Sequence, residues 1–288
     1  MKVRKAVILV AGFGTRFLPA TKATPKEMFP LVDKPVAQYA VEEAAAAGIE
    51  EVIFVTGQAK RAIEDHFDRN FELEYLLDKK GKHEQLAQVR EISEMTRFAY
   101  VRQKEMKGWG HALLQARMLV DDEPFAVMLP DDVFTGSVPA IGELIERYEE
   151  FQASIVGMLE VPEADVHRYG VVAGEEVREG VLKMSDIVEK PATKKAPSRY
   201  AVMGRYILTP DIFPLLENLS PGAGGEIVGT DAIRQLIQEA PVYASQMSAR
   251  RHDAGEKLGY LKAVVEIALE RDDLGDDFRT FLNERLQK

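Results

Sequence analysis

The residue types best suited to chemistry lie near the N-terminus, in the run LVAGFGTRFLPATKATPK from Leu9 to Lys26. This run leaves an apolar segment, passes through Gly12 and Gly14, and then carries three cationic side chains within eleven residues. The chain as a whole is acidic, with a formal net charge of −10. A local cluster of positive charge behind a glycine-containing loop is suited to bind an anion. The cluster, which predicts a site for a phosphorylated small molecule, consists of Arg16, Lys22 and Lys26.

The spacing of this loop excludes the two commonest nucleotide-binding loops. A P-loop requires Gly-x4-Gly-Lys-Ser/Thr, which is absent, and a dinucleotide fingerprint requires a small third residue where Phe17 stands. Because Pro19 and Pro25 keep the following chain extended or turned, the string favours a loop that wraps a nucleotide without a helix starting at once. The alternative is a tight strand-to-helix turn with solvated lysines, the usual interpretation of a bare Gly-x-Gly.

Alternating strand and helix patterns in the first half predict the elements that position this loop. Apolar runs typical of buried parallel strands alternate with segments of helical spacing. Such units imply an α/β fold with a Rossmann-like, mixed but mostly parallel sheet, wound by helices and binding ligands beyond the carboxyl ends of its strands. The expected strands are 6–10, 51–56, 98–101 and 125–129, and the expected helices are 35–48, 59–71 and 110–120.

The second half is less regular and predicts a small β elaboration followed by helices. Thr209 and Pro210 predict the cap and the first residue of one helix. Because the chain has no internal repeat and no low-complexity linker, we expect one domain over residues 1–288. Strands are expected at 154–161 and 200–208, short antiparallel strands within 169–190, a glycine-rich loop at 220–225, and further helices at 230–239, 256–271 and 276–286.

Composition restricts the classes of partner. Hydrophobic residues make up 46% and charged residues 29%, which is ordinary for a globular protein in water. No apolar run is long enough for a membrane span, and the five apolar residues after the charged N-terminus are too few for a signal-peptide core. An acidic chain without a basic stripe binds nucleic-acid backbone poorly. Since the chain also lacks cysteine, we expect a cytoplasmic protein with no nucleic-acid or membrane partner.

The longer motif, Ala11-Gly-x-Gly-Thr-Arg16 followed by Pro25-Lys26, resembles the signature of the sugar-1-phosphate nucleotidyltransferases. The full string from Leu18 to Pro30 resembles the bacterial uridylyltransferases of that family. Two places depart from the family pattern, because Val228-Gly229 stand where Gln-Leu is usual and Asp131-Asp132 where a single Asp is usual. Further matches follow in order along almost the whole chain, at 103–112, 129–131, 169–172, 187–191, 204–206, 225–227 and 253–255.

This resemblance implies that the protein joins UTP and glucose 1-phosphate to give UDP-glucose and pyrophosphate, with Mg²⁺ as cofactor. A phosphate oxygen of the sugar phosphate attacks the α-phosphorus of UTP in line. Because that oxygen is already ionised at neutral pH, positioning and preorganised cations carry the catalysis and no general base is needed. Two rival hypotheses stay open: a thymidylyltransferase for the same sugar phosphate, and a catalytically silent nucleotide-sugar sensor.

The resemblance also implies that the two halves of the chain bind different substrates and that the protein forms an oligomer. The nucleotide-binding half covers about residues 1–135, and the sugar-phosphate half with the C-terminal helices covers about residues 136–288. Members of the family form dimers and tetramers, so a homodimer or homotetramer is expected.

On the nucleotide side, the resemblance places Arg16 and Lys26 against the triphosphate. Arg offers a planar fork for phosphate oxygens and Lys a compact charge, although a solvated surface role is the alternative for both. A Gln amide can both donate to and accept from a pyrimidine edge. Trp109 is expected to pack in the core, and His111 to cap a helix. The implied nucleotide-binding residues are Ala11, Gly12, Gly14, Thr15, Glu27, Gln103 and Gly108.

On the sugar side, Glu189 is expected to accept hydrogen bonds from sugar hydroxyls and Lys190 to hold the sugar's phosphate. A surface Glu-Lys pair before a Pro turn is the alternative. The implied sugar-phosphate residues are Gly170, Glu189, Lys190 and Gly204, with Glu226 as a weaker candidate in the loop 222–226.

The implied metal ligands are Asp131 and Asp253, because Mg²⁺ prefers carboxylate oxygens together with substrate phosphates. Asp132 is the neighbouring alternative, and an aspartate after a strand can also simply form a cap or a turn. The expected catalytic set is Arg16, Lys26, Asp131 and Lys190.

Overall fold

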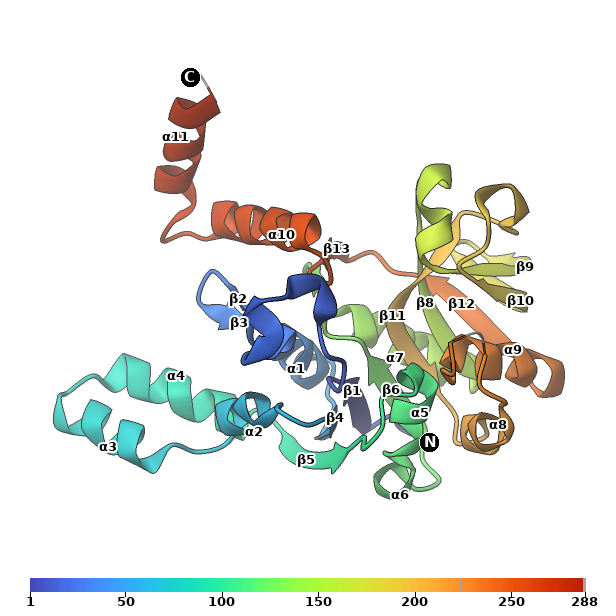
Figure 1. Ribbon diagram of the computed structural model, residues 1–288, viewed down its shortest axis with the longest axis horizontal. Helices are drawn as coiled ribbons and strands as arrows, with labels where there is room; N and C mark the ends of the chain where they lie inside the picture. Colours follow the sequence, from blue (N-terminus) through green and yellow to red (C-terminus); the bar gives the residue numbers. More distant parts are fainter. Residues whose placement is uncertain (223, 287–288) are drawn as a thin grey trace.

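The computed structural model describes residues 1–222 and 224–286, and within them one mixed sheet of nine strands spans both halves of the chain (Figure 1). Its order is β5-β4-β1-β6-β11-β8-β12-β10-β9. The first four of these strands are parallel, as their buried apolar runs predicted. They are β5 (Arg97–Arg102), β4 (Glu51–Thr56), β1 (Lys5–Leu9) and β6 (Phe125–Met128).

The remaining strands come from the second half and pair mainly antiparallel. β11 runs antiparallel to both β6 and β8, and β9 and β10 form the predicted antiparallel elaboration. β12, which the sequence patterns did not predict, lies parallel to β8. The strands are β11 (Tyr200–Leu208), β8 (Ser154–Glu160), β12 (Val242–Gln246), β10 (Val181–Glu189) and β9 (Gly170–Arg178).

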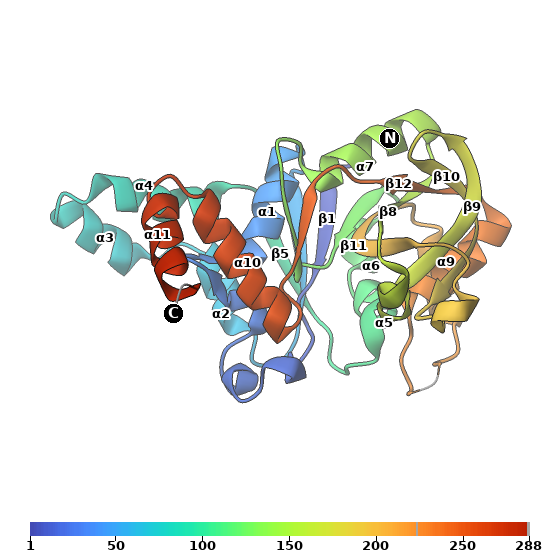
Figure 2. The same cartoon turned by 90° about the horizontal axis from the view of Figure 1, so that it is seen from above.

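Helices cover both faces of the sheet and create two hydrophobic cores (Figure 2). Because successive side chains on a strand point to opposite faces, β1 contributes Ala6 and Ile8 to one core and Val7 and Leu9 to the other. Helices on both faces explain why this strand is apolar from Ala6 to Leu9. The first core lies under α1 (Val36–Ala46) and α7 (Ala140–Phe151), and the second under α5 (Gly108–Leu114), α6 (Arg117–Val120), α8 (Ile212–Asn218) and α9 (Gly229–Glu239).

Between β4 and β5 the chain forms three helices where the sequence predicted one at 59–71. α2 (Arg61–Phe67) packs on the core, whereas α3 (Phe71–Lys79) and α4 (His83–Glu94) form a hairpin that projects from the body (Figure 1). Leu86 is the buried residue of α4, and Ile92 packs against the first core. The predicted helix 110–120 is likewise divided, because α5 ends at Leu114 and α6 begins at Arg117.

The predicted start of the helix after β11 is wrong by two residues. α8 has Asp211 as its N-cap and Ile212 as its first residue, rather than Thr209 and Pro210. The reason is that the Thr209 hydroxyl contacts Ser154 Oγ at 3.2 Å, on the neighbouring strand, instead of capping the helix. Thr209 and Pro210 supply backbone carbonyls that accept from the first turn of α8.

A small second sheet brings the C-terminal part of the chain back beside the end of β6. In it, β7 (Asp132–Thr135) pairs antiparallel with β13 (Arg250–Asp253), and Asp253 lies opposite Asp132. α10 (Lys257–Glu270) and α11 (Gly275–Leu286) follow, and α11 extends away from the body (Figure 1). Within the part of the chain that the structure describes, no helix is long and apolar enough to cross a membrane. Short elements complete the fold: η1 (Thr15–Phe17), η2 (Ala20–Lys22), η3 (Lys26–Met28), β2 (Pro30–Leu31), β3 (Lys34–Pro35), η4 (Glu163–Arg168) and η5 (Thr193–Lys195).

Candidate active site

A pocket of about 380 Å³ lies at the carboxyl end of β1, and we call it the loop pocket. Short 3-10 turns, not a helix, follow the glycine loop, which confirms the predicted loop type over a strand-to-helix turn. Gly14 has a left-handed φ of 65°, and its carbonyl accepts from the Thr21 hydroxyl at 2.9 Å, so the chain folds back and brings Lys26 beside it. The predicted residues that line the loop pocket are Ala11, Gly12, Gly14, Thr15, Lys26, Glu27, Gln103 and Gly108, with Glu226.

One end of the loop pocket carries buried polar groups with fixed partners. Gln103 donates its amide Nε2 to the Gly108 carbonyl at 3.1 Å and contacts His111 Nδ1 at 3.0 Å. His111 therefore does not cap a helix, as the sequence had predicted, but lies inside α5 and holds the amide of Gln103. The orientation of that amide is thus set before any ligand arrives.

Glu27, which is only 1% exposed, forms an ion pair with Lys60 at 2.7 Å. Burial raises the pKa of Glu27, against the effect of the Lys60 and Lys26 charges. Burial likewise lowers the pKa of Lys60, against the effect of Glu27. Lys60 lies just before α2, and the sequence patterns did not single it out, because its role depends on a partner 33 residues away.

A second pocket, of about 490 Å³, adjoins the first, and we call it the aspartate pocket. The two pockets share Trp109, Leu129 and Asp131 in their walls, so they form one cleft with two compartments. Arg16 points its guanidinium toward the Gly255 carbonyl in this second compartment. The other predicted residues that line the aspartate pocket are Gly170, Glu189, Lys190, Gly204, Asp131, Asp132 and Asp253.

An ion pair stands in the wall between the compartments, because Lys26 Nζ lies 2.6 Å from Asp131 Oδ2. Burial disfavours both charges, but the attraction between them prevails. The pKa of Asp131 is lowered and that of Lys26 is raised from their ordinary values. Both groups are therefore charged at neutral pH. The sequence predicted each residue but not their contact.

The aspartate pocket also contains two cations that the sequence patterns missed, Arg168 and Arg251. Arg251 donates from Nε to Asp132 Oδ1 at 2.6 Å and from Nη1 to the Tyr169 hydroxyl at 3.2 Å. Arg168 donates to Asp253 Oδ2 at 3.2 Å. Each arginine stands next to a motif that the sequence did single out, but a surface role is usual for arginine, so proximity in sequence was a weak signal.

Asp131 and Asp253 face a common point, and this arrangement suits a metal ion. A Cβ on Gly255 would lie 2.9 Å from Asp131 Oδ2 and 3.2 Å from Asp253 Oδ1, so glycine leaves a cradle between the two carboxylates. Within residues 1–222 and 224–286, no group of three or more His, Asp or Glu side chains is placed to hold a metal ion by itself. Two carboxylates that leave further positions to water and phosphate match the way proteins bind Mg²⁺. Asp132 is instead engaged by Arg251.

Glu189 is the last residue of β10, Lys190 follows it, and both line the aspartate pocket. Glu189 Oε2 accepts from the Thr230 hydroxyl at 3.0 Å, which fixes its carboxylate. Lys190 has a left-handed φ of 45°, which is rare for a non-glycine residue and is typical of functional sites. Its backbone N–H donates to the Tyr169 carbonyl at 3.0 Å, which holds it there, while its side chain remains largely exposed. Gly204 also has a positive φ of 65°, and a Cβ there would lie 2.7 Å from Asp132 Oδ2.

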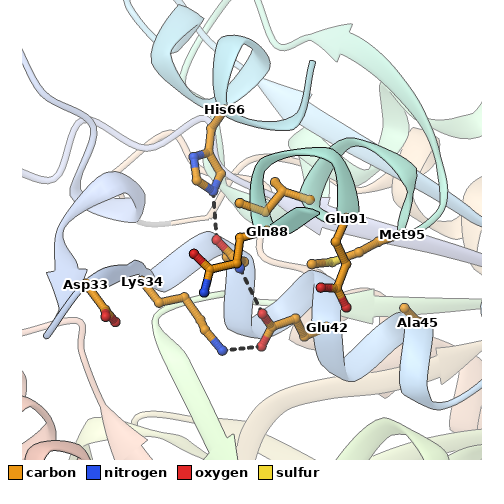
Figure 3. A pocket seen from close by; sticks show the side chains of 10 residues that line it. Asp33, Lys34, Glu42, Ala45, His66, Gln88, Glu91 and Met95 are labelled. Carbon is orange, nitrogen blue, oxygen red and sulfur yellow. Dashed lines mark hydrogen bonds and ion pairs between the residues drawn. The ribbon is translucent and has the colours of Figure 1, made fainter. Parts of the chain in front are cut away.

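Another pocket, of about 550 Å³, lies between α1, α2 and α4 (Figure 3). Its polar side chains bond to one another: His66 contacts Gln38 at 2.9 Å, and Gln38 and Lys34 both donate to Glu42. Burial lowers the pKa of His66. Because none of the residues predicted to do chemistry lines this pocket, we place the site in the two-compartment cleft.

Comparison with known proteins identifies the family of this chain. A family model described as nucleotidyl transferase matches residues 5–270. The chain belongs to the nucleotidyl transferase family. A UTP–glucose-1-phosphate uridylyltransferase 2 of Staphylococcus saprophyticus is 52% identical over 281 residues, which are 98% of this chain and 97% of the relative. The predicted family is thereby confirmed for this nucleotidyl transferase.

Solved structures give the same result for the fold. A UTP-bound UGPase from Acinetobacter baumannii matches with a TM-score of 0.91 at 44% identity and covers 98% of this chain and 99% of that one. A UDP-glucose pyrophosphorylase complexed with UDP-glucose matches with a TM-score of 0.86 at 45% identity, over 93% of this chain and 100% of that one. These similarities confirm the predicted α/β class with its mixed sheet.

A fully buried ion pair supports the segment of this nucleotidyl transferase that carries Asp131. Arg205, on β11, is 0% exposed and donates to the carbonyls of Leu129 and Asp132 at 2.9 Å each. Its guanidinium also forms two hydrogen bonds to Glu43, of 3.0 and 2.7 Å. The carbonyls on either side of the Asp131 turn are therefore tied to one rigid group. The sequence marked Arg205 only as part of a motif and predicted no role for it.

We expect Arg205→Met to lower the free energy of unfolding by about 3–5 kcal/mol, because it leaves Glu43 buried and unpaired. The matched control is Arg234→Met, which removes an exposed bidentate pair with Asp186 and should cost no more than about 1 kcal/mol. Urea unfolding of both variants measures the difference. Equal losses in the two variants would show that the Arg205 pair has no special structural role.

Proposed function

We propose that this chain transfers the uridylyl group of UTP to glucose 1-phosphate and releases pyrophosphate, giving UDP-glucose. The observation that carries the proposal is the pair of adjoining compartments that meet at Lys26 and Asp131. Such a cleft can hold two anionic substrates with their reacting groups side by side. The names of the relatives and the UTP and UDP-glucose complexes of related structures support this reaction over thymidylyl transfer or a silent sensor.

In this proposal the loop pocket takes UTP. Gln103 and Glu27, at its polar end, face the uracil, because a fixed amide can pair with a pyrimidine edge. Loop residues 11–15 bring backbone N–H groups to the phosphates. Lys26 lies where the triphosphate must reach the second compartment, and Arg16 lies across that junction. The two cations would bracket the reacting phosphorus.

The aspartate pocket takes glucose 1-phosphate. Glu189, held by Thr230, accepts hydrogen bonds from sugar hydroxyls, and Lys190 contacts the sugar's phosphate. Arg168 and Arg251 add positive charge to the same compartment. With Arg16, the pocket has four basic side chains that can hold the anionic nucleophile. No general base is needed, since the attacking oxygen is already ionised.

Nucleotidyl transferases of this kind generally use a divalent metal ion, and we propose Mg²⁺ held by Asp131 and Asp253. When bound, it would neutralise phosphate charge as the phosphate oxygen of the sugar phosphate attacks the α-phosphorus and pyrophosphate leaves. The chain's own part is to align that attack and to stabilise the developing charge with Lys26 and Arg16. Asp132, engaged by Arg251, keeps that arginine oriented rather than binding the metal.

Three broader expectations belong to the proposal. The continuous sheet across both halves supports one domain over residues 1–288. The family resemblance supports a homodimer or homotetramer. The absence of cysteine from the sequence supports a cytoplasmic protein.

The purified protein, supplied with Mg²⁺ and glucose 1-phosphate, should release pyrophosphate with UTP and much less with dTTP, ATP, CTP or GTP. A coupled pyrophosphate assay with each nucleotide in turn measures this preference. Release that is faster with dTTP than with UTP would overturn the uridylyl assignment. No release with any nucleotide would overturn the enzymatic proposal itself.

Lys190→Ala should raise the KM for glucose 1-phosphate by about 10–100-fold, because a hydrogen bond to a charged group contributes roughly 1.5–3 kcal/mol. The Kd for UTP, measured by titration calorimetry, should stay within about twofold of the wild-type value, since UTP occupies the other compartment. Lys194→Ala is the matched control, because Lys194 is exposed and outside the pocket lining. Equal weakening of both substrates by Lys190→Ala would contradict the assignment of the compartments.

Asp131→Asn should reduce metal-dependent turnover by about 10²-fold or more, because it removes a carboxylate proposed to hold the metal ion and takes away the charge that pairs with Lys26. Circular dichroism should show an intact fold. Asp272→Asn, an exposed aspartate beyond α10, serves as the control and should leave turnover unchanged. Near-normal turnover in Asp131→Asn would move the metal to other ligands.

A further inference from the structure

Trp109 is the single tryptophan of the chain, and it stands where the two compartments meet. It is the second residue of α5, and its ring stacks on Tyr206 with centroids 5.4 Å apart and an interplanar angle of 25°. One side of the Trp109 ring is therefore packed in the core, as expected. The residue is nevertheless only half-buried, and it lines both the loop pocket and the aspartate pocket.

Gly229 lies directly against this indole. An added Cβ at residue 229 would lie 2.2 Å from Cη2 and 2.4 Å from Cζ2 and Cζ3 of Trp109, closer than any side chain can approach. The backbone at Gly229 is not in the left-handed region, so the conformation of the chain does not require glycine there. What requires it is the space that the indole occupies. Residue 229 is also one of the places where the sequence departs from the family pattern.

The backbone around this contact is fixed. α5 and α9 lie side by side (Figure 1), and the segments at their N-termini are joined by two hydrogen bonds. The N–H of Ile227 donates to the Lys107 carbonyl at 2.7 Å, and the N–H of Gly110 donates to the Ile227 carbonyl at 3.0 Å. These hydrogen bonds hold the two helix ends at a fixed separation. A larger side chain at 229 therefore fits only if the side chain at 109 is smaller or displaced.

The indole borders both pockets, and the residues packed against it connect it to the aspartate pocket. Its stacking partner Tyr206 lines only the aspartate pocket, and so does Thr230, the neighbour of Gly229 that holds Glu189. The indole is therefore placed to contact a ligand in the compartment that also contains Glu189 and Lys190.

We propose that Trp109, admitted by Gly229, is the specificity-determining wall of the sugar subsite and excludes hexose 1-phosphates with bulkier ring substituents. The inference rests on the proposed assignment of the aspartate pocket to glucose 1-phosphate. A flat indole offers a broad, rigid apolar surface to a sugar ring, while Glu189 is placed to bind its hydroxyls. A wall of this kind discriminates by size, and one buried carbon group can change the preference by about 10–200-fold.

The test compares Trp109→Leu, Gly229→Leu and the double variant with the wild-type enzyme. Trp109→Leu should raise the KM for glucose 1-phosphate by about fivefold to tenfold and leave the KM for UTP within about twofold. It should also increase the ratio of kcat/KM for N-acetylglucosamine 1-phosphate to that for glucose 1-phosphate by at least about tenfold. Trp109→Phe, which keeps an aromatic wall, should retain most of the wild-type preference.

Gly229→Leu alone should displace the indole, which will shift the emission of the single tryptophan and lower the melting temperature. In the double variant the leucine at 229 refills the space, so the KM for glucose 1-phosphate and the melting temperature should recover beyond the product of the single effects. An unchanged sugar preference in Trp109→Leu would overturn the proposal. The proposal would also be overturned if Gly229→Leu raised the KM for glucose 1-phosphate and lowered the melting temperature equally in the wild-type and Trp109→Leu backgrounds.

Failure of this inference differs from failure of the proposed function. If the wild-type enzyme is active and Trp109→Leu has the same kcat/KM for both sugar phosphates, only the proposed role of Trp109 is contradicted. If wild type does not turn over, titration of its tryptophan emission with glucose 1-phosphate still decides the contact. Saturable quenching by glucose 1-phosphate that is absent with glucose alone supports it, and no response up to millimolar sugar phosphate overturns it.

Discussion

Two opposite charges, partly buried in the wall between the pockets, set the constraint on which the site depends. Lys26 and Asp131 each lose most of their hydration, and each is kept charged by the other at 2.6 Å. Burying either alone would be costly, so the loop that carries Lys26 and the turn that carries Asp131 must be held in register. Arg205 holds the turn through the carbonyls of Leu129 and Asp132. The glycine loop folds back to hold the lysine.

The mixed sheet explains why two substrates can meet at this wall. Its parallel half ends in loops at one edge, where β1 and β6 deliver the glycine loop and Asp131. Its antiparallel half delivers Glu189 and Lys190 from β10 and then returns the chain through β13, which pairs with β7 and places Asp253 near Asp131. The first half therefore builds most of the loop pocket, which we propose for UTP, and the second half completes the aspartate pocket, which we propose for glucose 1-phosphate.

The local patterns of the sequence predicted the strands of the parallel half and the loop type. The family resemblance supplied most of the predicted residues that line the two compartments. They failed where structure depends on distant partners. Lys60 needs Glu27, Arg251 needs Asp132, and no spacing in the sequence reveals either pair. Thr209 was expected to cap a helix, but Ser154 on a neighbouring strand takes its hydroxyl. The α3–α4 hairpin was not predicted either, although Leu73, Leu76 and Leu77 of α3 have helical spacing.

The most direct test of the central claim is a crystal structure of this protein with UDP-glucose. The account predicts uracil in the loop pocket beside Gln103, the glucose ring in the aspartate pocket between Glu189 and Trp109, and the diphosphate crossing the wall at Lys26 and Asp131. A complex with the uracil beside Glu189, or with both ends of the ligand in one pocket, would contradict the two-compartment account.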